Sequence, residues 1–235
     1  MKPEWNMSGA TLRRVREQCG WTQQQMGRRL GVSQPYVALL EKGRRPVTSK
    51  LARKAVREFN LDPVLLPASG KDASRVTADS LTRDLGRLGY PGFAYLRGGW
   101  MKNPGEVLLA ALTQPELESR LAEALPWVLL NYPEVNTDWL VQQARLLNLT
   151  NRVGFVVDLA RAVARQKDGP NSPRYVALNR LADLLTRSRL AVEDTLGQAS
   201  LSDSERNWLR ANATESARFW QILSDWRPEL LQYAE

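Results

Sequence analysis

The stretch that decides the fold is TQQQMGRRLGVSQPYVALLEKG, residues 22–43. Its opening, residues 22–25, has the Thr-x-x-Gln pattern that predicts a capping box at the start of a short helix. Gly31 is the residue type that ends such a helix in the left-handed conformation, and Ser33 followed by Pro35 predicts the start of the next helix. The stretch therefore predicts two short helices that cross at a steep angle through a tight turn at Gly31.

The residues around this turn favour a small helical domain. Gly27 is a small residue at the point where the first helix of the pair must approach the second. The seam between the two helices is filled by apolar side chains, namely Met26, Leu30, Val32, Val37 and Leu40. Periodicity predicts further helices at about residues 10–19 and 48–59, and a short final turn runs from Asp62-Pro63 to Leu66. Residues 10–66 are therefore expected to form five short helices.

The linked pattern Thr-Gln…Leu-Gly-Val-Ser…Leu-Glu-Lys-Gly-Arg-Arg-Pro resembles the helix-turn-helix family of phage repressor, Cro and xenobiotic-response-element (XRE) regulators over about residues 9–66. The resemblance implies a five-helix, lambda-repressor-like domain whose third helix enters the DNA major groove while the second crosses the backbone. An unrelated antiparallel helix pair would also end its helices at glycines. It would leave the linked pattern and the local charge unexplained.

The resemblance also implies which residues read DNA bases, namely Gln34, Pro35, Ala38 and Leu39. The amide of Gln34 suits bidentate contact with adenine, whereas Pro35 and Ala38 offer only apolar contact, for instance to a thymine methyl. Leu39 departs from the family pattern, which often has a polar or basic residue there. It either contacts a thymine methyl or lies in a protein interface.

A second set of residues is expected to contact phosphate: Gln23, Arg28, Ser33, Tyr36, Arg44, Arg45 and Lys50. Arg44 and Arg45 lie in the loop beyond the recognition helix, which favours contact. For Arg28 and Lys50 the alternative is a solvated charged face. Arg16 and Glu41 match a pair that in some relatives forms a buried salt bridge between the first and third helices, so their expected role is structural.

The charge of the chain is concentrated in the same region. Residues 1–66 hold 13 Lys and Arg against 5 Asp and Glu, a net of +8, whereas residues 67–235 hold 20 against 20. This distribution predicts a phosphate-binding module joined to an electrically neutral part.

Composition excludes several classes of protein. The chain has no histidine, which excludes His-based acid–base catalysis, Ser-His-Asp triads and histidine metal ligation. Cys19 is the single cysteine, so no intramolecular disulfide and no Cys-rich zinc site are expected, and a reducing cytoplasm suits the chain. No apolar run is long enough to span a membrane. We expect no catalytic residues, no metal and no cofactor.

The expected domain organisation has three parts in an all-α chain: a helix-turn-helix domain at residues 1–66, a linker at 67–76 and a larger helical domain at 77–235. The linker is expected because residues 67–76 are small and polar. Helices in the larger domain are predicted at about 78–89, 104–112, 115–130, 137–148, 150–167, 173–192, 203–211, 214–224 and 227–233. Ser202 with Glu205 predicts a capping box.

Aromatic residues mark the least explained part of the larger domain. The segment 90–100 predicts an irregular aromatic loop that either binds a partner or covers the helical core. The six tryptophans of the larger domain are interpreted as core residues rather than a ligand cage.

Three roles stay open for the larger domain: oligomerisation, ligand sensing, or binding of a partner that it neutralises. The architecture is reminiscent of antitoxins in bacterial toxin–antitoxin operons. We therefore predict a cytoplasmic, dimeric repressor that binds a palindromic operator in double-stranded DNA, is nucleoid-associated when bound, and binds a cognate toxin through the larger domain. The alternatives are a stand-alone ligand-responsive regulator and a protein-interaction inhibitor with secondary DNA binding.

Overall fold

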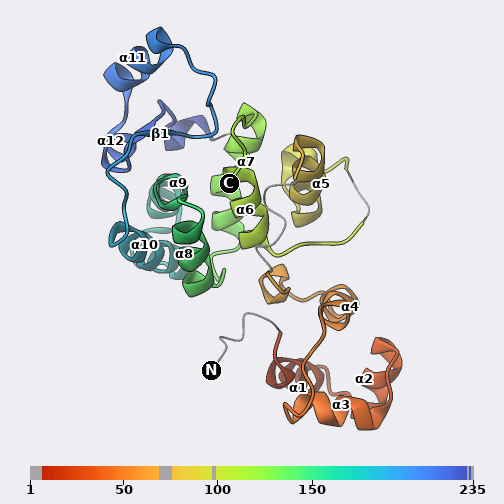
Figure 1. The fold of residues 1–235 in the computed structure, drawn as a ribbon. Coiled ribbons are helices and arrows are strands. Elements are labelled where there is room, and N and C mark those ends of the chain that lie inside the picture. Colours follow the sequence, from red (N-terminus) through yellow and green to blue (C-terminus); the bar gives the residue numbers. More distant parts are fainter. Residues whose placement is uncertain (1–6, 69–75, 97–98, 232, 234–235) are drawn as a thin grey trace. The chain divides into compact units, whose positions relative to one another are not determined.

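The computed structural model describes residues 7–68, 76–96, 99–231 and 233. The prediction of an all-α chain is confirmed, because the described residues are mostly helical (Figure 1). The chain divides into two compact units. One comprises Met1–Ala68 with Trp100–Asn103, and the other comprises Ser69–Gly99 with Pro104–Glu235. Most of the predicted linker, residues 69–75, lies outside the described residues.

The described part of the first unit holds the predicted short helices, and the N-caps predicted at Thr22 and Ser33 are present. The elements are α1 (Gly9–Gln18), α2 (Gln23–Leu30), α3 (Gln34–Glu41), α4 (Ser49–Phe59) and the 3₁₀ turn η1 (Pro63–Leu65). The hydroxyl of Thr22 accepts from the Gln25 N–H at 3.2 Å, and the Gln25 side chain accepts from the Thr22 N–H at 2.8 Å. Gly31 caps α2 in the left-handed conformation with φ 69°. The capping box and the turn are therefore confirmed.

Two glycines let the helices of this unit approach closely. A Cβ atom on Gly27 would lie 2.6 Å from the carbonyl oxygen of Val32, so the absence of a side chain lets α2 pass the start of α3. A Cβ atom on Gly9 would overlap the carbonyl oxygen of Leu40, which brings the start of α1 against α3. Of the predicted seam residues, Met26, Leu30, Val37 and Leu40 are in the buried core of the unit, and Val32 is partly buried against it.

The larger unit contains the remaining elements of the described chain. They are α5 (Ala78–Leu88), η3 (Pro91–Phe93), α6 (Pro104–Leu112), α7 (Ser119–Asn131), α8 (Thr137–Leu146), α9 (Thr150–Asp168), α10 (Pro173–Thr186), β1 (Asp194–Thr195), α11 (Asp203–Asn212), α12 (Glu215–Phe219), β2 (Ile222–Leu223) and η4 (Pro228–Leu230). The predicted capping box at Ser202 is confirmed at the start of α11.

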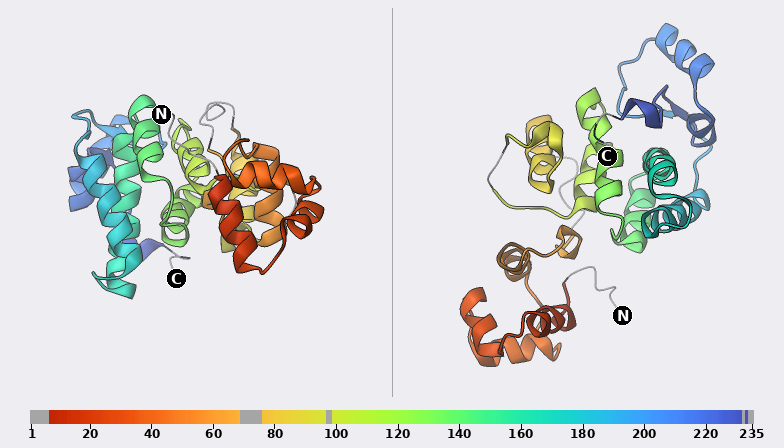
Figure 2. Two further views of the ribbon diagram at one scale, coloured as in Figure 1. Left: turned by 90° about the horizontal axis from the view of Figure 1, so that it is seen from below. Right: turned by 180° about the vertical axis from the view of Figure 1, so that it is seen from behind.

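Helix α9 is the centre of the larger unit. It contacts α6, α7, α8, α10 and α12, and Figures 1 and 2 show α9 and α10 side by side. Gly154 of α9 faces Trp220, and a Cβ atom on Gly154 would overlap the Trp220 ring. The indole Nε1 of Trp220 donates to Oδ2 of Asp158 at 2.7 Å, which gives this fully buried ring its polar partner.

Four of the helices predicted in this unit differ from the structure. The helix predicted at 227–233 is only the 3₁₀ turn η4 among the described residues. The helix predicted at 115–130 begins at Ser119, because residues 115–117 pair instead with residues 197–199. The helix predicted at 173–192 ends at Thr186, and that predicted at 214–224 ends at Phe219. Beyond these ends, β1 and β2 form a two-residue parallel pairing that the sequence analysis did not predict.

The aromatic loop and the tryptophans divide between core and surface. Tyr90 and Phe93 are buried, with ring centroids 5.3 Å apart, whereas Tyr95 is 71% exposed. Burial raises the pKa of the Tyr90 hydroxyl above its ordinary value. Three tryptophans, Trp127, Trp139 and Trp220, are in the core as predicted. Trp100 and Trp208 are more than half exposed, so the core interpretation is wrong for these two.

Candidate nucleic-acid interface

The candidate interface is built on α3. Its N-cap is Ser33, whose hydroxyl accepts from the Tyr36 N–H at 3.4 Å, and Pro35 occupies the first turn, where a missing N–H is tolerated. Val37 and Leu40 are buried and fix one face of the helix on the core of the first unit. Gln34 and Pro35 lie at the exposed N-terminal end, where a recognition helix contacts base edges.

A buried ion pair holds α3 to α1. The guanidinium of Arg16 donates to both carboxylate oxygens of Glu41, at 2.6 Å from Nε and 3.1 Å from Nη2. The side chain of Glu41 is only 3% exposed and that of Arg16 is 14% exposed. The hydrogen bond to Glu41 raises the pKa of Arg16 above its ordinary value, so the guanidinium is charged at every physiological pH. Arg16 also donates to the Trp21 carbonyl at 2.9 Å.

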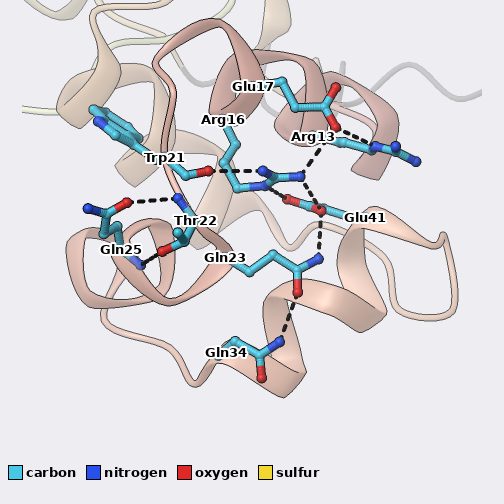
Figure 3. A network of polar contacts seen from close by, with 9 residues as sticks. All are labelled: Arg13, Arg16, Glu17, Trp21, Thr22, Gln23, Gln25, Gln34 and Glu41. Atoms are coloured by element: carbon cyan, nitrogen blue, oxygen red, sulfur yellow. Dashed lines mark hydrogen bonds and ion pairs between the residues drawn. The ribbon is translucent and has the colours of Figure 1, made fainter.

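The ion pair continues to the surface through two glutamines (Figure 3). The amide Nε2 of Gln23 donates to Oε2 of Glu41 at 2.9 Å. The amide Nε2 of Gln34 in turn donates to Oε1 of Gln23 at 2.8 Å. Residues from α1, α2 and α3 are therefore joined in one series that starts at a buried guanidinium and ends at an exposed amide.

This series fixes the orientation of both amides. An ionised carboxylate can only accept hydrogen bonds, so the NH₂ group of Gln23 must face Glu41 and its oxygen must face Gln34. Gln34 must then present an N–H to Gln23, which leaves its carbonyl oxygen and a second N–H. Adenine displays one donor and one acceptor in the major groove, N6–H₂ and N7, which match these two groups.

The other three predicted base-reading residues follow Gln34 along α3. Pro35 is exposed, and Ala38 and Leu39 are half-buried. Each presents only apolar side-chain atoms, which suits contact with a thymine methyl. The Leu39 side chain takes part in no recorded polar contact. Its carbonyl oxygen accepts from the N–H groups of Arg44 and Arg45, at 2.9 and 3.2 Å.

The predicted phosphate-contacting cations lie in three different elements of this unit. Arg28 is in the last turn of α2, Lys50 is in the first turn of α4, and Arg44 and Arg45 follow α3. All four side chains are exposed, and within the described part of the chain none of them forms an ion pair. Their charge is therefore available to an anionic partner.

The remaining phosphate candidates are tied into the fold in part. The Ser33 hydroxyl is occupied by its N-cap contact, and the ring of Tyr36 packs against the core, which leaves it half-buried. Gln23 is half-buried between Glu41 and Gln34. The structure thus brings Arg16, Glu41, Gln23 and Gln34 together, and records no contact among the cationic candidates.

Sequence reasoning missed two contacts that support this site. The Arg29 guanidinium lies 4.3 Å from the centroid of the Trp21 ring, and that ring packs against Phe59 at 5.1 Å. This arrangement joins α2 to α4 and directs Arg29 onto an aromatic face. Trp21 precedes α2 and Arg29 lies in its last turn. Nothing in the sequence between them distinguishes this contact from an arginine exposed to solvent.

Other kinds of site were also sought. Among the residues that the structure describes, no group of three or more acidic or cysteine side chains could hold a metal ion. No helix in the described ranges is long and apolar enough to cross a membrane.

The crossing of α2 and α3 through Gly31, together with the exposed start of α3, defines a helix-turn-helix domain. A family model described as a helix-turn-helix domain matches residues 9–68 of the chain. A protein from Cereibacter sphaeroides named propionyl-CoA carboxylase regulator is 36% identical over 72 residues. Those residues make up 31% of this chain and 15% of that relative. No solved structure matches the chain.

Proposed function

We propose that this chain is a sequence-specific DNA-binding repressor whose helix α3 reads the major groove. The observation that carries the proposal is the series from Arg16 to Gln34, because it holds an exposed amide that retains one acceptor and one donor, the two groups that pair with adenine. The helix-turn-helix match and the regulatory name of the partial relative support the same role. Under this proposal Gln34 reads a base pair, while Pro35, Ala38 and Leu39 contact thymine methyl groups.

Phosphate contact is assigned to the side chains that carry free charge or lie beside Gln34. Arg28, Arg44, Arg45 and Lys50 supply cations, and Gln23, Ser33 and Tyr36 supply neutral polar groups at the start of α2 and α3. If about six phosphates are neutralised, the logarithm of the association constant should fall with the logarithm of salt concentration at a slope near −5.

A mobility-shift titration tests this proposal. The full chain is titrated against duplex DNA from its own upstream intergenic region at several salt concentrations. Arg44→Ala should weaken binding to all sequences about uniformly and reduce the slope by about 1. Arg210→Ala is the matched control, because Arg210 is paired with Glu193 in the larger unit and should leave the slope unchanged. A wild-type slope close to zero contradicts the proposal.

The repressor is proposed to bind as a homodimer on a palindromic operator in the cytoplasm. A single module of this size buries little surface on DNA, and two half-sites about 34 Å apart double the contact. Sedimentation of the full chain with and without a palindromic duplex measures the stoichiometry. One chain per operator at saturation contradicts this part of the proposal.

The finer role that we propose is that of an autoregulating antitoxin. It is supported by architecture, since a basic helix-turn-helix unit is joined to a larger, electrically neutral unit. The larger unit would then bind a cognate toxin. Expression of the adjacent gene should arrest growth, and co-expression of this chain should relieve the arrest. A neighbouring gene that is harmless when expressed alone contradicts the antitoxin role.

A ligand-responsive regulator is the second candidate, and one observation favours it. Two adjoining pockets of about 480 and 680 Å³ share Asp158, Arg161 and Ser216 as lining residues. Pockets of this size accommodate small molecules. A thermal-shift screen of the full chain against a metabolite panel, with Arg161→Ala as the comparison, tests this role. The third alternative is a protein-interaction inhibitor for which DNA binding is secondary. The mobility-shift titration described above distinguishes it from a sequence-specific repressor.

A further inference from the structure

A short segment from far along the sequence belongs to the helix-turn-helix unit. Trp100–Asn103 is part of the first compact unit, although more than thirty residues separate it from Ala68. Met101 packs against the core of that unit. The guanidinium of Arg57 on α4 lies 5.9 Å from the centroid of the Trp100 ring. The unit is therefore discontinuous in sequence, and its last segment lies outside the residues that the family model matches.

Asn103 makes the most specific contact of this segment. Its side chain is buried, with 4% of the residue exposed, and its Nδ2 donates to the carbonyl oxygens of Val64 at 3.0 Å and Leu66 at 2.8 Å. Among the recorded hydrogen bonds no other group donates to these two carbonyls. One amide has two N–H groups, so a single asparagine satisfies both acceptors at the end of η1.

Packing leads from these carbonyls to the candidate interface. The turn η1 contacts α4, and α4 contacts α2, which carries Gln23. In the other direction along the chain, Asn103 is followed directly by Pro104, the first residue of α6. Apart from Glu106, every residue of α6 is buried in the larger unit. No spacer residue therefore separates Asn103 from a core helix of the larger unit.

We propose that Asn103 is a positioning residue of the DNA-reading unit. It closes the end of η1 and thereby holds α4 and α2 in place, so the affinity for DNA depends on a residue outside the helix-turn-helix match. This inference rests on the proposed function for its DNA-binding readout. Its readout by hydrogen exchange is independent of DNA.

The test uses full-length Asn103→Ala and Asn103→Asp with the upstream duplex as the probe. Asn103→Ala leaves two carbonyls without a donor, and we expect about fivefold weaker DNA binding or more. In Asn103→Asp at pH 8 the introduced carboxylate faces two carbonyl oxygens, so the loss should be larger. At pH 5 partial protonation restores one donor, and the ratio to wild-type affinity should improve. A role confined to filling space predicts no such pH dependence.

Hydrogen exchange of the same proteins provides the second readout. Amides of residues 56–66 should exchange faster in both variants, while those of α9 should not change. Asn136→Ala is the matched control, because Asn136 caps α8 in the larger unit and its loss should leave DNA affinity within about twofold. If Asn103→Asp unfolds the first unit, Asn103→Ala is compared with Met101→Ala, since the latter removes packing and keeps both hydrogen bonds. Met101→Ala should weaken DNA binding less than Asn103→Ala does.

The inference is overturned if both Asn103 variants bind DNA within about twofold of wild type and protect residues 56–66 as wild type does. It is also overturned if Met101→Ala, which keeps both hydrogen bonds, weakens DNA binding as much as Asn103→Ala does. A third outcome separates the two proposals. If wild type does not bind the duplex but the amides of residues 56–66 still exchange faster in the Asn103 variants, the positioning role stands and the proposed DNA-binding function fails.

Discussion

The two units contain polar networks of similar chemistry that end in different places. In the first unit the ion pair of Arg16 and Glu41 continues through Gln23 to the exposed side chain of Gln34. In the larger unit Arg152 donates to both oxygens of Asp194 and to the carbonyls of residues 112 and 114, and these groups join α9 to neighbouring loops. The first network ends in the exposed amide of Gln34, whereas the second joins α9 to the end of α6 and to β1. We propose that the exposed end of the first network is the part that recognises DNA.

The two units differ in net charge rather than in the pairing of their cations. Residues 1–66 carry a net charge of +8, whereas residues 67–235 carry a net charge of zero. Both units contain arginines paired with a carboxylate, such as Arg13 in the first and Arg210 in the larger unit. Arg44 and Lys50 of the first unit are exposed and form no ion pair among the described residues, so their charge is available to phosphate.

Removal of the buried carboxylate in the first unit should have the largest effect. Glu41→Ala leaves the partly buried Arg16 guanidinium with only the more distant Glu17, at 3.4 Å, as a counter-charge and leaves the Gln23 amide without its acceptor. The loss of one partner of a buried ion pair costs about 3–5 kcal/mol. We expect the first unit to unfold at lower urea concentration and DNA binding to be lost with the fold.

Urea unfolding followed by hydrogen exchange in α1 and α3 measures this effect. Glu58→Ala is the control, because Glu58 pairs with the exposed Arg57 on α4, away from Arg16, and should change stability little. Normal stability of Glu41→Ala would contradict the structural role of the ion pair. Loss of protection in α9 would contradict an effect confined to the first unit.

Two matched glycine substitutions, one in each unit, compare how DNA binding depends on the stability of each unit. Gly27→Ala places a Cβ atom 2.6 Å from the Val32 carbonyl, and Gly154→Ala places one against the Trp220 ring. Overpacking of this kind costs about 1–3 kcal/mol. Gly27→Ala should destabilise the first unit and weaken DNA binding. Gly154→Ala should displace Trp220 from Asp158 and destabilise the larger unit, with DNA binding retained.

Thermal unfolding followed by tryptophan fluorescence and by mobility shift compares the two glycine variants directly. The Trp220 emission should move to longer wavelength in Gly154→Ala only. Equal losses of DNA affinity in the two variants would contradict the assignment of DNA recognition to the first unit alone.

Local signals explain what the sequence analysis predicted well, and distant contacts explain what it missed. The capping residues Thr22 and Ser202 act within three residues of themselves, so their helices could be placed from sequence. The end of α12 depends on Trp220, which turns into the core against Gly154 and leaves Gln221 with a φ of 55°. No pattern within residues 214–224 contains that information.

The end of α10 and the discontinuous first unit follow the same rule. The side chain of Asn151 accepts from the Leu190 N–H and donates to the Leu190 carbonyl, and this contact from α9 captures residues that were predicted to continue the helix. Asn103 reaches Val64 and Leu66 across a comparable separation. In the candidate interface, residue types indicated Gln23 and Gln34 separately. Their hydrogen bond to each other required the structure.

A base-specific substitution tests the open end of the first network. Gln34→Ala removes the oriented amide but no buried group, so the fold should be retained. We expect a loss of about 1–3 kcal/mol in DNA binding at one base pair of the operator, with other positions unaffected. Binding to a library of single-base operator variants measures the position and size of the loss.

Gln23→Ala is the companion variant, because it leaves Gln34 in place and removes the group that orients it. It should reduce discrimination at the same base pair by a smaller amount. If Gln34→Ala leaves discrimination unchanged at every position, DNA shape is the better account of specificity, and the series from Arg16 to Gln34 serves the fold alone.

The smallest expected effect concerns an exposed ion pair of the larger unit. The hydrogen bond from Arg210 lowers the pKa of Glu193 below its ordinary value. The pair therefore stabilises the folded chain fully at pH values above the unfolded pKa of about 4.3. This contribution is lost as the pH falls through the lower pKa of the folded state. Wild type should therefore be slightly more stable than Glu193→Gln at pH 6, and the difference should vanish at acid pH. Urea unfolding of both proteins from pH 6 to pH 3 measures this difference in stability, with Glu134→Gln as an exposed control that forms no ion pair in the described structure.

DNA affinity at pH 6 should be equal in all three proteins, because a paired charge in the larger unit contributes to its own stability and does not attract phosphate. A difference that grows as the pH falls, or a change in DNA affinity, would contradict this division of charge between the two units.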